Sequence, residues 1–163
     1  MNQSRQQYKE IKLVGLKVRT NNHDELKNSE GKISKLVEKY WAEQIADKIV
    51  NPISPGVTYG VYTNYATDEH GDYDYFIGEQ VESFENQSIP VLDCIIIPEQ
   101  EYIKFTTQQG MIPDVIVETW QNIWQMNSNQ LGGKRRYAAD FEIYDSRAKD
   151  PSNAIVDIYI GIE

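Results

Sequence analysis

Two stretches of this chain, 83 residues apart, carry the same order of apolar patterns, and this repeat restricts the fold more than any other feature. Shifting the first half by 83 residues places Ile33 on Ile116, within two stretches of helical periodicity. The same shift places residues 74–78 on residues 157–161, and both segments read Asp-x-x-Ile-Gly. Because one shift matches both a helix face and a later strand, the pattern indicates an internal duplication.

Each copy is predicted to contain a strand, a helix and two further strands. In the first copy, about residues 10–84, these are a strand at 11–20, a helix at 29–49 that starts at Ser29, and strands at 57–65 and 73–81. In the second copy, about residues 88–163, these are an extended region at 89–107, a helix at 113–126 and strands at 137–144 and 154–162. We therefore expect an α+β fold in one domain over residues 1–163. Its two β-α-β-β repeats, related by pseudo-twofold symmetry, would share a mainly antiparallel sheet with both helices on one face.

The composition indicates a soluble protein with an acidic surface. The chain has 163 residues, of which 25 are acidic and 16 are basic, so its net charge is −9. Such a surface repels nucleic-acid phosphates and anionic lipids, so we expect no direct nucleic-acid partner and no membrane partner. The N-terminus has no apolar segment of the kind that signal peptides contain, which predicts a cytoplasmic protein. The chain is also rich in aromatic residues, with 11 Tyr, 4 Phe and 3 Trp.

The sequence lacks the common motifs of catalytic centres, nucleotide-binding loops and metal sites. It contains two histidines, His23 and His70, and one cysteine, Cys94. The acidic stretch 68–74 has its glycine in the wrong place for a calcium loop. The basic run 132–136 lacks the spacing of a phosphate-binding loop. We therefore expect no metal and no cofactor, and we assign no catalytic residue.

One carboxylate stands out within the apolar strand 137–144. Strand alternation places Glu142 on the same face as Asp140 and Tyr144. Two interpretations are open. Either this face is in contact with water, or Glu142 lies in an aromatic seam between the two copies, where a lone charge is costly and a cationic guest would compensate it. The shift of 83 residues matches Glu142 to Tyr59.

Four segments together resemble the gyrase-inhibitor-like family, the effector-binding domain that is also attached to AraC-type and MerR-type multidrug-sensing regulators. The segments are VGLKVR at 14–19, TWQNIW at 119–124, FEIYD at 141–145 and DIYIGI at 157–162. The resemblance covers nearly the whole chain. It implies two β-α-β-β repeats around a central pocket for amphipathic, often cationic and aromatic compounds.

The resemblance also implies a set of binding residues. A buried glutamate supplies the counter-charge in this family, and Glu142 is the matching position. The candidates for the aromatic lining are Tyr59, Tyr75, Tyr102, Trp120, Trp124 and Tyr159. The regulators carry a helix-turn-helix domain, for which the roughly ten residues before the first predicted strand leave no room. The chain therefore resembles the stand-alone members, and a role in transcription would require a separate DNA-binding partner.

These observations predict a stand-alone protein that binds small lipophilic, cationic molecules, for sequestration or for effector sensing. One alternative is a hydrolase of reactive, cyclopropane-bearing toxins, in which Glu142 activates water as a general base. Another is an inhibitor protein whose partner is gyrase. Binding is favoured over catalysis because a lone carboxylate in an apolar pocket serves binding at least as well.

Overall fold

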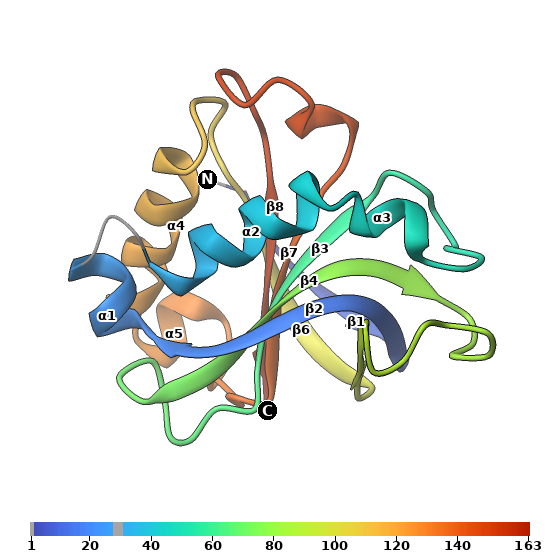
Figure 1. Cartoon of the computed structure of the whole chain (residues 1–163). Coiled ribbons are helices and arrows are strands. Elements are labelled where there is room, and N and C mark those ends of the chain that lie inside the picture. The colour runs from blue at the N-terminus through green and yellow to red at the C-terminus, as the bar shows by residue number, and fades with distance from the viewer. Residues whose placement is uncertain (1, 28–30) are drawn as a thin grey trace.

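The computed structural model describes residues 2–27 and 31–163, and its centre is one eight-stranded antiparallel sheet (Figure 1). The order of strands across the sheet is β1-β6-β8-β7-β3-β4-β2-β5. The strands are β1 (Asn2–Tyr8), β2 (Ile11–Asn21), β3 (Thr58–Thr63), β4 (Asp72–Val81), β5 (Asp93–Ile97), β6 (Gln100–Thr106), β7 (Ala139–Tyr144) and β8 (Asp157–Ile162). No helix in the described part of the chain is long and apolar enough to cross a membrane.

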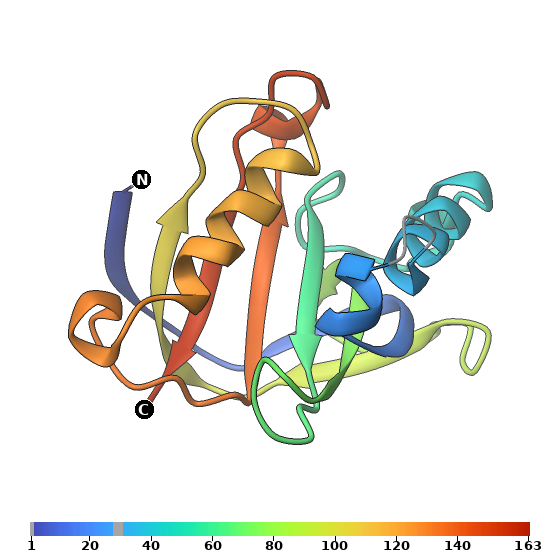
Figure 2. The same cartoon turned by 90° about the vertical axis from the view of Figure 1, so that its left-hand side faces the viewer.

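Five α-helices accompany the sheet, and the two longest lie on the same face of it (Figure 2). The helices are α1 (Asn22–Lys27), α2 (Lys32–Ala42), α3 (Ile45–Lys48), α4 (Asp114–Trp124) and α5 (Ser128–Leu131). A short 3-10 helix at Ser146–Ala148 follows β7. Helix α2 packs through Tyr40 on the half that contains β2 and β4, while α4 packs through Ile116 and Ile123 on the half that contains β6 and β8.

The strand order reads as two halves related by a twofold axis between β3 and β7. From this centre one half continues through β4 and β2, and the other through β8 and β6. Each outer strand joins the half formed by the other repeat. Strand β1, from the start of the chain, pairs with β6, and β5, from the second repeat, pairs with β2. The predicted fold class, two β-α-β-β repeats sharing an antiparallel sheet with two helices on one face, is confirmed. The extent of the domain over residues 1–163 stays a prediction.

Several elements differ from the sequence-based expectation. The unpredicted strand β1 is polar throughout, so it carries no apolar alternation that a sequence pattern could reveal. The expected helix at 29–49 is two helices, since Gln44 between α2 and α3 adopts a left-handed conformation (φ 51°, ψ 47°). Its expected N-cap, Ser29, lies outside the described residues. Helix α5 forms in the expected loop 127–136, where Asn127 and Gln130 make a capping box.

The two faces of the sheet bury different side chains. Between the sheet and the helices lie two apolar clusters, which Tyr62 of β3 and Tyr73 and Tyr75 of β4 join. On the opposite face, called here the far face, the rings of Phe141 and Tyr159 stack with centroids 4.6 Å apart. Tyr8, Tyr59 and Tyr102 complete this aromatic cluster. The far face is therefore a packed core built from sheet residues alone.

Strands β2 and β4 approach each other most closely at Gly15, which lies opposite Gly78. A Cβ atom at Gly15 would stand 1.9 Å from the carbonyl oxygen of Ile77, and one at Gly78 would stand 2.2 Å from that of Val14. The obstacle in both cases is backbone, which cannot rotate away as a side chain can. We therefore expect Gly15→Ala to lower the free energy of unfolding by about 3 kcal/mol. Lys17→Ala, at an exposed position of the same strand, should change it by less than about 0.5 kcal/mol.

Urea unfolding followed by circular dichroism measures both differences. Equal unfolding midpoints for the Gly15→Ala and Lys17→Ala variants would contradict this explanation of the close approach.

Candidate functional site

A cavity of about 850 Å³ lies between the sheet and helices α1, α2 and α4. The exposed side chains of Leu26, Trp41 and Val117 form an apolar rim where it opens to solvent. Eight aromatic residues line the cavity, namely Trp41, Tyr62, Tyr65, Tyr73, Tyr75, Trp120, Trp124 and Tyr144. Its size lies within the range of pockets that enclose drug-sized molecules, about 300–1,000 Å³.

Local sequence periodicity explains how these side chains reach the cavity. In α4, Ile116, Trp120 and Trp124 follow at intervals of four residues, so they project from one side of the helix. In β7, Glu142 and Tyr144 are two residues apart and therefore point to the same face of the sheet. The sheet and the helix thus present a carboxylate and an indole to the same space.

Glu142 is 1% exposed, and three neutral groups donate hydrogen bonds to its carboxylate. The Tyr144 hydroxyl lies 2.6 Å from Oε1, while the Trp120 indole Nε1 and the Tyr62 hydroxyl lie 2.7 and 2.9 Å from Oε2. Burial raises the pKa of Glu142, and the hydrogen bonds from Tyr144, Trp120 and Tyr62 oppose this rise. Burial and the neighbouring carboxylate raise the pKa values of Tyr62 and Tyr144, which keeps both hydroxyls protonated as donors.

The carboxylate of Glu142 has no positive partner among the described residues. Hydrogen bonds from neutral donors stabilise a buried charge only in part, because they bring no compensating charge. Two basic residues line the cavity, Arg135 and Lys149. Four acidic residues besides Glu142 also line it, namely Glu25, Glu38, Glu69 and Asp145. The site therefore combines a negative electrostatic environment with many aromatic faces.

The structure brings some of the predicted site residues together and separates others. Tyr75, Trp120 and Trp124 line the same cavity as Glu142. The remaining three candidates, Tyr59, Tyr102 and Tyr159, pack in the aromatic cluster of the far face. The sheet backbone thus lies between these three side chains and the cavity.

The position of Tyr59 shows why the repeat comparison placed it on the wrong face. In the β3–β7 pairing, Gly60 lies opposite Glu142 and Tyr59 lies opposite Ile143. Residues directly opposite each other in an antiparallel pair point to the same face, and a shift by one residue reverses the face. Gly60, rather than Tyr59, therefore faces the cavity beside Glu142. A Cβ atom there would stand 2.8 Å from the Tyr75 hydroxyl.

Sequence reasoning missed the tyrosines that contact or surround Glu142. Tyr144 could have been found, because it is two residues from Glu142 on the same predicted strand. Tyr62 could not, because its contact with Glu142 depends on the register between β3 and β7. Tyr65 and Tyr73 reach the cavity from the end of β3 and the start of β4, near a loop whose course the sequence does not specify.

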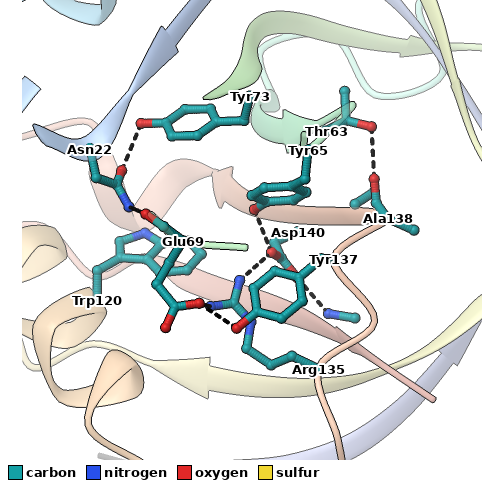
Figure 3. Close-up of polar contacts among 12 residues, drawn as sticks. Asn22, Thr63, Tyr65, Glu69, Tyr73, Trp120, Arg135, Tyr137, Ala138 and Asp140 are labelled. Carbon is teal, nitrogen blue, oxygen red and sulfur yellow. Dashed lines mark hydrogen bonds and ion pairs between the residues drawn. The ribbon is translucent and has the colours of Figure 1, made fainter. Parts of the chain in front are cut away.

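A second buried carboxylate, Asp140, lies on the same face of β7 as Glu142 and is paired with a cation (Figure 3). Arg135 donates a hydrogen bond of 2.6 Å to Asp140, and the Tyr65 hydroxyl donates another of 2.5 Å. Burial disfavours the charged guanidinium, but Asp140, Tyr65 and Tyr137 together outweigh this effect and raise the pKa of Arg135. The guanidinium lies over the ring of Tyr137, whose hydroxyl donates to Glu69. Asp140 is thus neutralised within the protein, whereas Glu142 is not.

The fold is that of effector-binding proteins. The chain belongs to the family of integron-associated effector binding proteins (Cass2), whose sequence model matches residues 6–162.

Solved structures share this fold, and a bacterial protein is similar to this chain in sequence. The integron cassette protein VCH_CASS2 from the mobile metagenome of Vibrio cholerae is 26% identical, with a TM-score of 0.75 over 99% of this chain and 95% of its own. The structure of SAV2435 bound to tetraphenylphosphonium is 20% identical, with a TM-score of 0.77 over 100% of this chain and 94% of its own. YobU of Bacillus subtilis (strain 168), named provisionally as a transcriptional regulator, is 28% identical over 93% of this chain and 92% of its own.

The raised pKa of Glu142 makes a prediction about stability and pH. A carboxyl group whose pKa is higher in the folded state than in the unfolded state costs stability as the pH rises through that interval. Glutamine keeps the shape of the side chain without the charge. We therefore expect Glu142→Gln to become more stable relative to the unchanged protein as the pH rises from about 4 to about 8, with a gain on the order of 1 kcal/mol.

Urea unfolding at a series of pH values measures this difference. Glu118→Gln, at an exposed position of α4, controls for the general loss of one negative charge. If the unchanged protein instead gained stability relative to Glu142→Gln with rising pH, the carboxylate would not be the costly buried charge described above.

Proposed function

We propose that this protein binds small lipophilic, positively charged molecules in the cavity, with Glu142 as the counter-charge. The observation that carries this proposal is a buried carboxylate held by three neutral donors, Tyr62, Trp120 and Tyr144, with no ion pair to any cation in the described part of the chain. A guest that brings one positive charge would supply the missing compensation.

The energetics of the cavity favour a cationic guest over a neutral one. Burying apolar surface contributes about 25 cal/mol per Å² for either kind of guest. A cation also gains about 0.5–2 kcal/mol from each aromatic face that it approaches, and it gains the attraction of a carboxylate in a poorly solvated environment. These additional contributions depend on charge, so they determine which class of compound is selected.

The relatives support the same class of ligand. The family is one of effector-binding proteins, and SAV2435, which shares the fold, has been solved with the lipophilic cation tetraphenylphosphonium. We propose that this chain belongs to the wider gyrase-inhibitor-like group of multidrug-binding domains.

The contacts of Glu142 favour binding over catalysis. Oε2 accepts two hydrogen bonds and Oε1 accepts one, so three of the four acceptor positions of the carboxylate are already occupied. A general base that activates water needs a free position aimed at that water. Charge compensation of a guest has no such requirement, so this arrangement supports a binding protein more than the hydrolase alternative.

We further propose a cytoplasmic role in sequestration or effector sensing. The net charge of −9 supports the absence of direct contact with nucleic acids and anionic membranes. We propose a protein partner, which is either a DNA-binding regulator that would carry a response in transcription, or gyrase.

The proposal predicts that tetraphenylphosphonium binds and that Glu142→Gln weakens its binding by about 10- to 100-fold, because one buried charge pair is lost. Isothermal titration calorimetry measures both dissociation constants. Triphenylphosphine oxide, a neutral compound with similar rings, serves as the matched ligand and should show less than about a threefold difference between the two proteins. If the variant bound the cation as tightly as the unchanged protein does, Glu142 would not be the counter-charge.

The placement of the aromatic residues predicts a second contrast. Trp124→Leu should weaken tetraphenylphosphonium binding by about fivefold or more, because it removes one aromatic face from the cavity. Tyr59→Leu should leave the dissociation constant unchanged, since Tyr59 packs on the far face. Calorimetry measures the dissociation constants of both variants. Quenching of tryptophan fluorescence can also measure binding to Tyr59→Leu, because this variant keeps all its tryptophans. If Tyr59→Leu weakened binding and Trp124→Leu did not, the guest would bind on the far face instead.

A further inference from the structure

Two buried carboxylates stand side by side on the cavity face of β7. Asp140 and Glu142 are 0% and 1% exposed, and their positions differ by two residues, or about 7 Å along a strand. Each accepts hydrogen bonds from neutral groups. Those of Asp140 come from the Tyr65 hydroxyl at 2.5 Å and the Gly161 backbone N–H at 2.8 Å. The two sites therefore resemble each other in their acid and in their tyrosine donor.

The site around Asp140 already contains a cation, the guanidinium of Arg135. It is 2.6 Å from Asp140 and 4.0 Å from Glu69, and its central carbon lies 4.3 Å from the centroid of the Tyr137 ring. The Arg135 side chain is 9% exposed and lines the cavity. A carboxylate below and an aromatic face alongside are the surroundings expected for a bound organic cation.

Trp120 connects the two sites. Its indole N–H donates to Glu142. The Arg135 guanidinium lies over the Trp120 ring (Figure 3), with its central carbon 5.9 Å from the ring centroid. A positive charge at Glu142 and the charge of Arg135 would thus lie on either side of one aromatic residue. Two further donors of Arg135, Nε and Nη1, are buried without a hydrogen-bond partner, so the guanidinium depends mainly on its ion pairs and on stacking.

We propose that the cavity contains two subsites for cations and that Arg135 permanently fills one of them, so that the protein selects guests with a single positive centre. This inference rests on the proposed function, because it assumes that the subsite at Glu142 takes a cationic guest. A rigid guest with two charges would bring its second charge against the guanidinium. Arg135 is accordingly a specificity-determining residue, and the subsite at Asp140 would take an organic cation if Arg135 were absent.

The test compares two probes that differ by one methyl group and one charge. These are 1-methyl-4-(4-pyridyl)pyridinium, with one positive charge at slightly alkaline pH, and methyl viologen, with two at opposite ends of the same aromatic system. By calorimetry, the unchanged protein should bind the monocation about tenfold more tightly than the dication. Arg135→Met should reverse this preference, because Asp140 can then compensate the second charge of the dication.

The double variant Arg135→Met with Asp140→Asn is the matched control. It lacks both charges of the second subsite, so the preference for the dication should disappear. The inference is overturned if the unchanged protein binds methyl viologen more tightly than the monocation, or if Arg135→Met leaves the preference as it was. Failure of the monocation itself to bind would instead count against the proposed function.

A second measurement decides the matter if Arg135→Met does not fold. Methylguanidinium at millimolar concentration should restore the folded circular dichroism signal or raise the melting temperature of Arg135→Ala, because it can occupy the vacated subsite. It should have no such effect on Arg135→Ala with Asp140→Asn. No difference between these two variants would show that Asp140 does not form a subsite for a free cation.

Discussion

The arrangement of the cavity depends on the cost of one buried charge. Glu142 carries a carboxylate into the centre of the protein, where its hydrogen-bond donors among the described residues are the hydroxyls of two tyrosines and one indole N–H. Neutral donors hold the group in place, but they leave its charge uncompensated. A protein that retains such a group in an aromatic cavity is poised to gain free energy from a positively charged guest.

The fold supplies this arrangement through the meeting of its two repeats. Strands β3 and β7 form the centre of the sheet, so side chains from both repeats surround the same point. Tyr62 comes from the first repeat, while Trp120 and Tyr144 come from the second. The aromatic cluster of the far face, with its stacked Phe141 and Tyr159, stabilises the sheet. The cavity can therefore form on the helix side of the sheet. The two repeats therefore differ in their side chains at the twofold axis, because Glu142 of the second repeat lies opposite Gly60 of the first.

Sequence patterns predicted the fold class because apolar periodicity and the internal repeat depend on local spacing. They did not reveal β1, whose polar residues gain their order from pairing with β6. Within the site, Glu142, Tyr75, Trp120 and Trp124 were named from the sequence and do lie around one cavity. Tyr59 was assigned to the wrong face because an error of one residue in the register of a strand exchanges its two faces. The pairing of Asp140 with Arg135 was also not predicted, because it depends on how the loop before β7 folds over the sheet.

The central claim is that a lipophilic cation occupies the cavity beside Glu142, and locating such a cation in a crystal tests it most directly. Tetraphenylarsonium is suited to this purpose, because the anomalous scattering of arsenic marks the position of the positive centre. The account predicts one strong arsenic peak in the cavity next to the Glu142 carboxylate, and its loss in crystals of Glu142→Gln soaked at the same concentration. A peak found only at two other acids of the cavity, Glu25 and Glu38, or only on the far face, would contradict it.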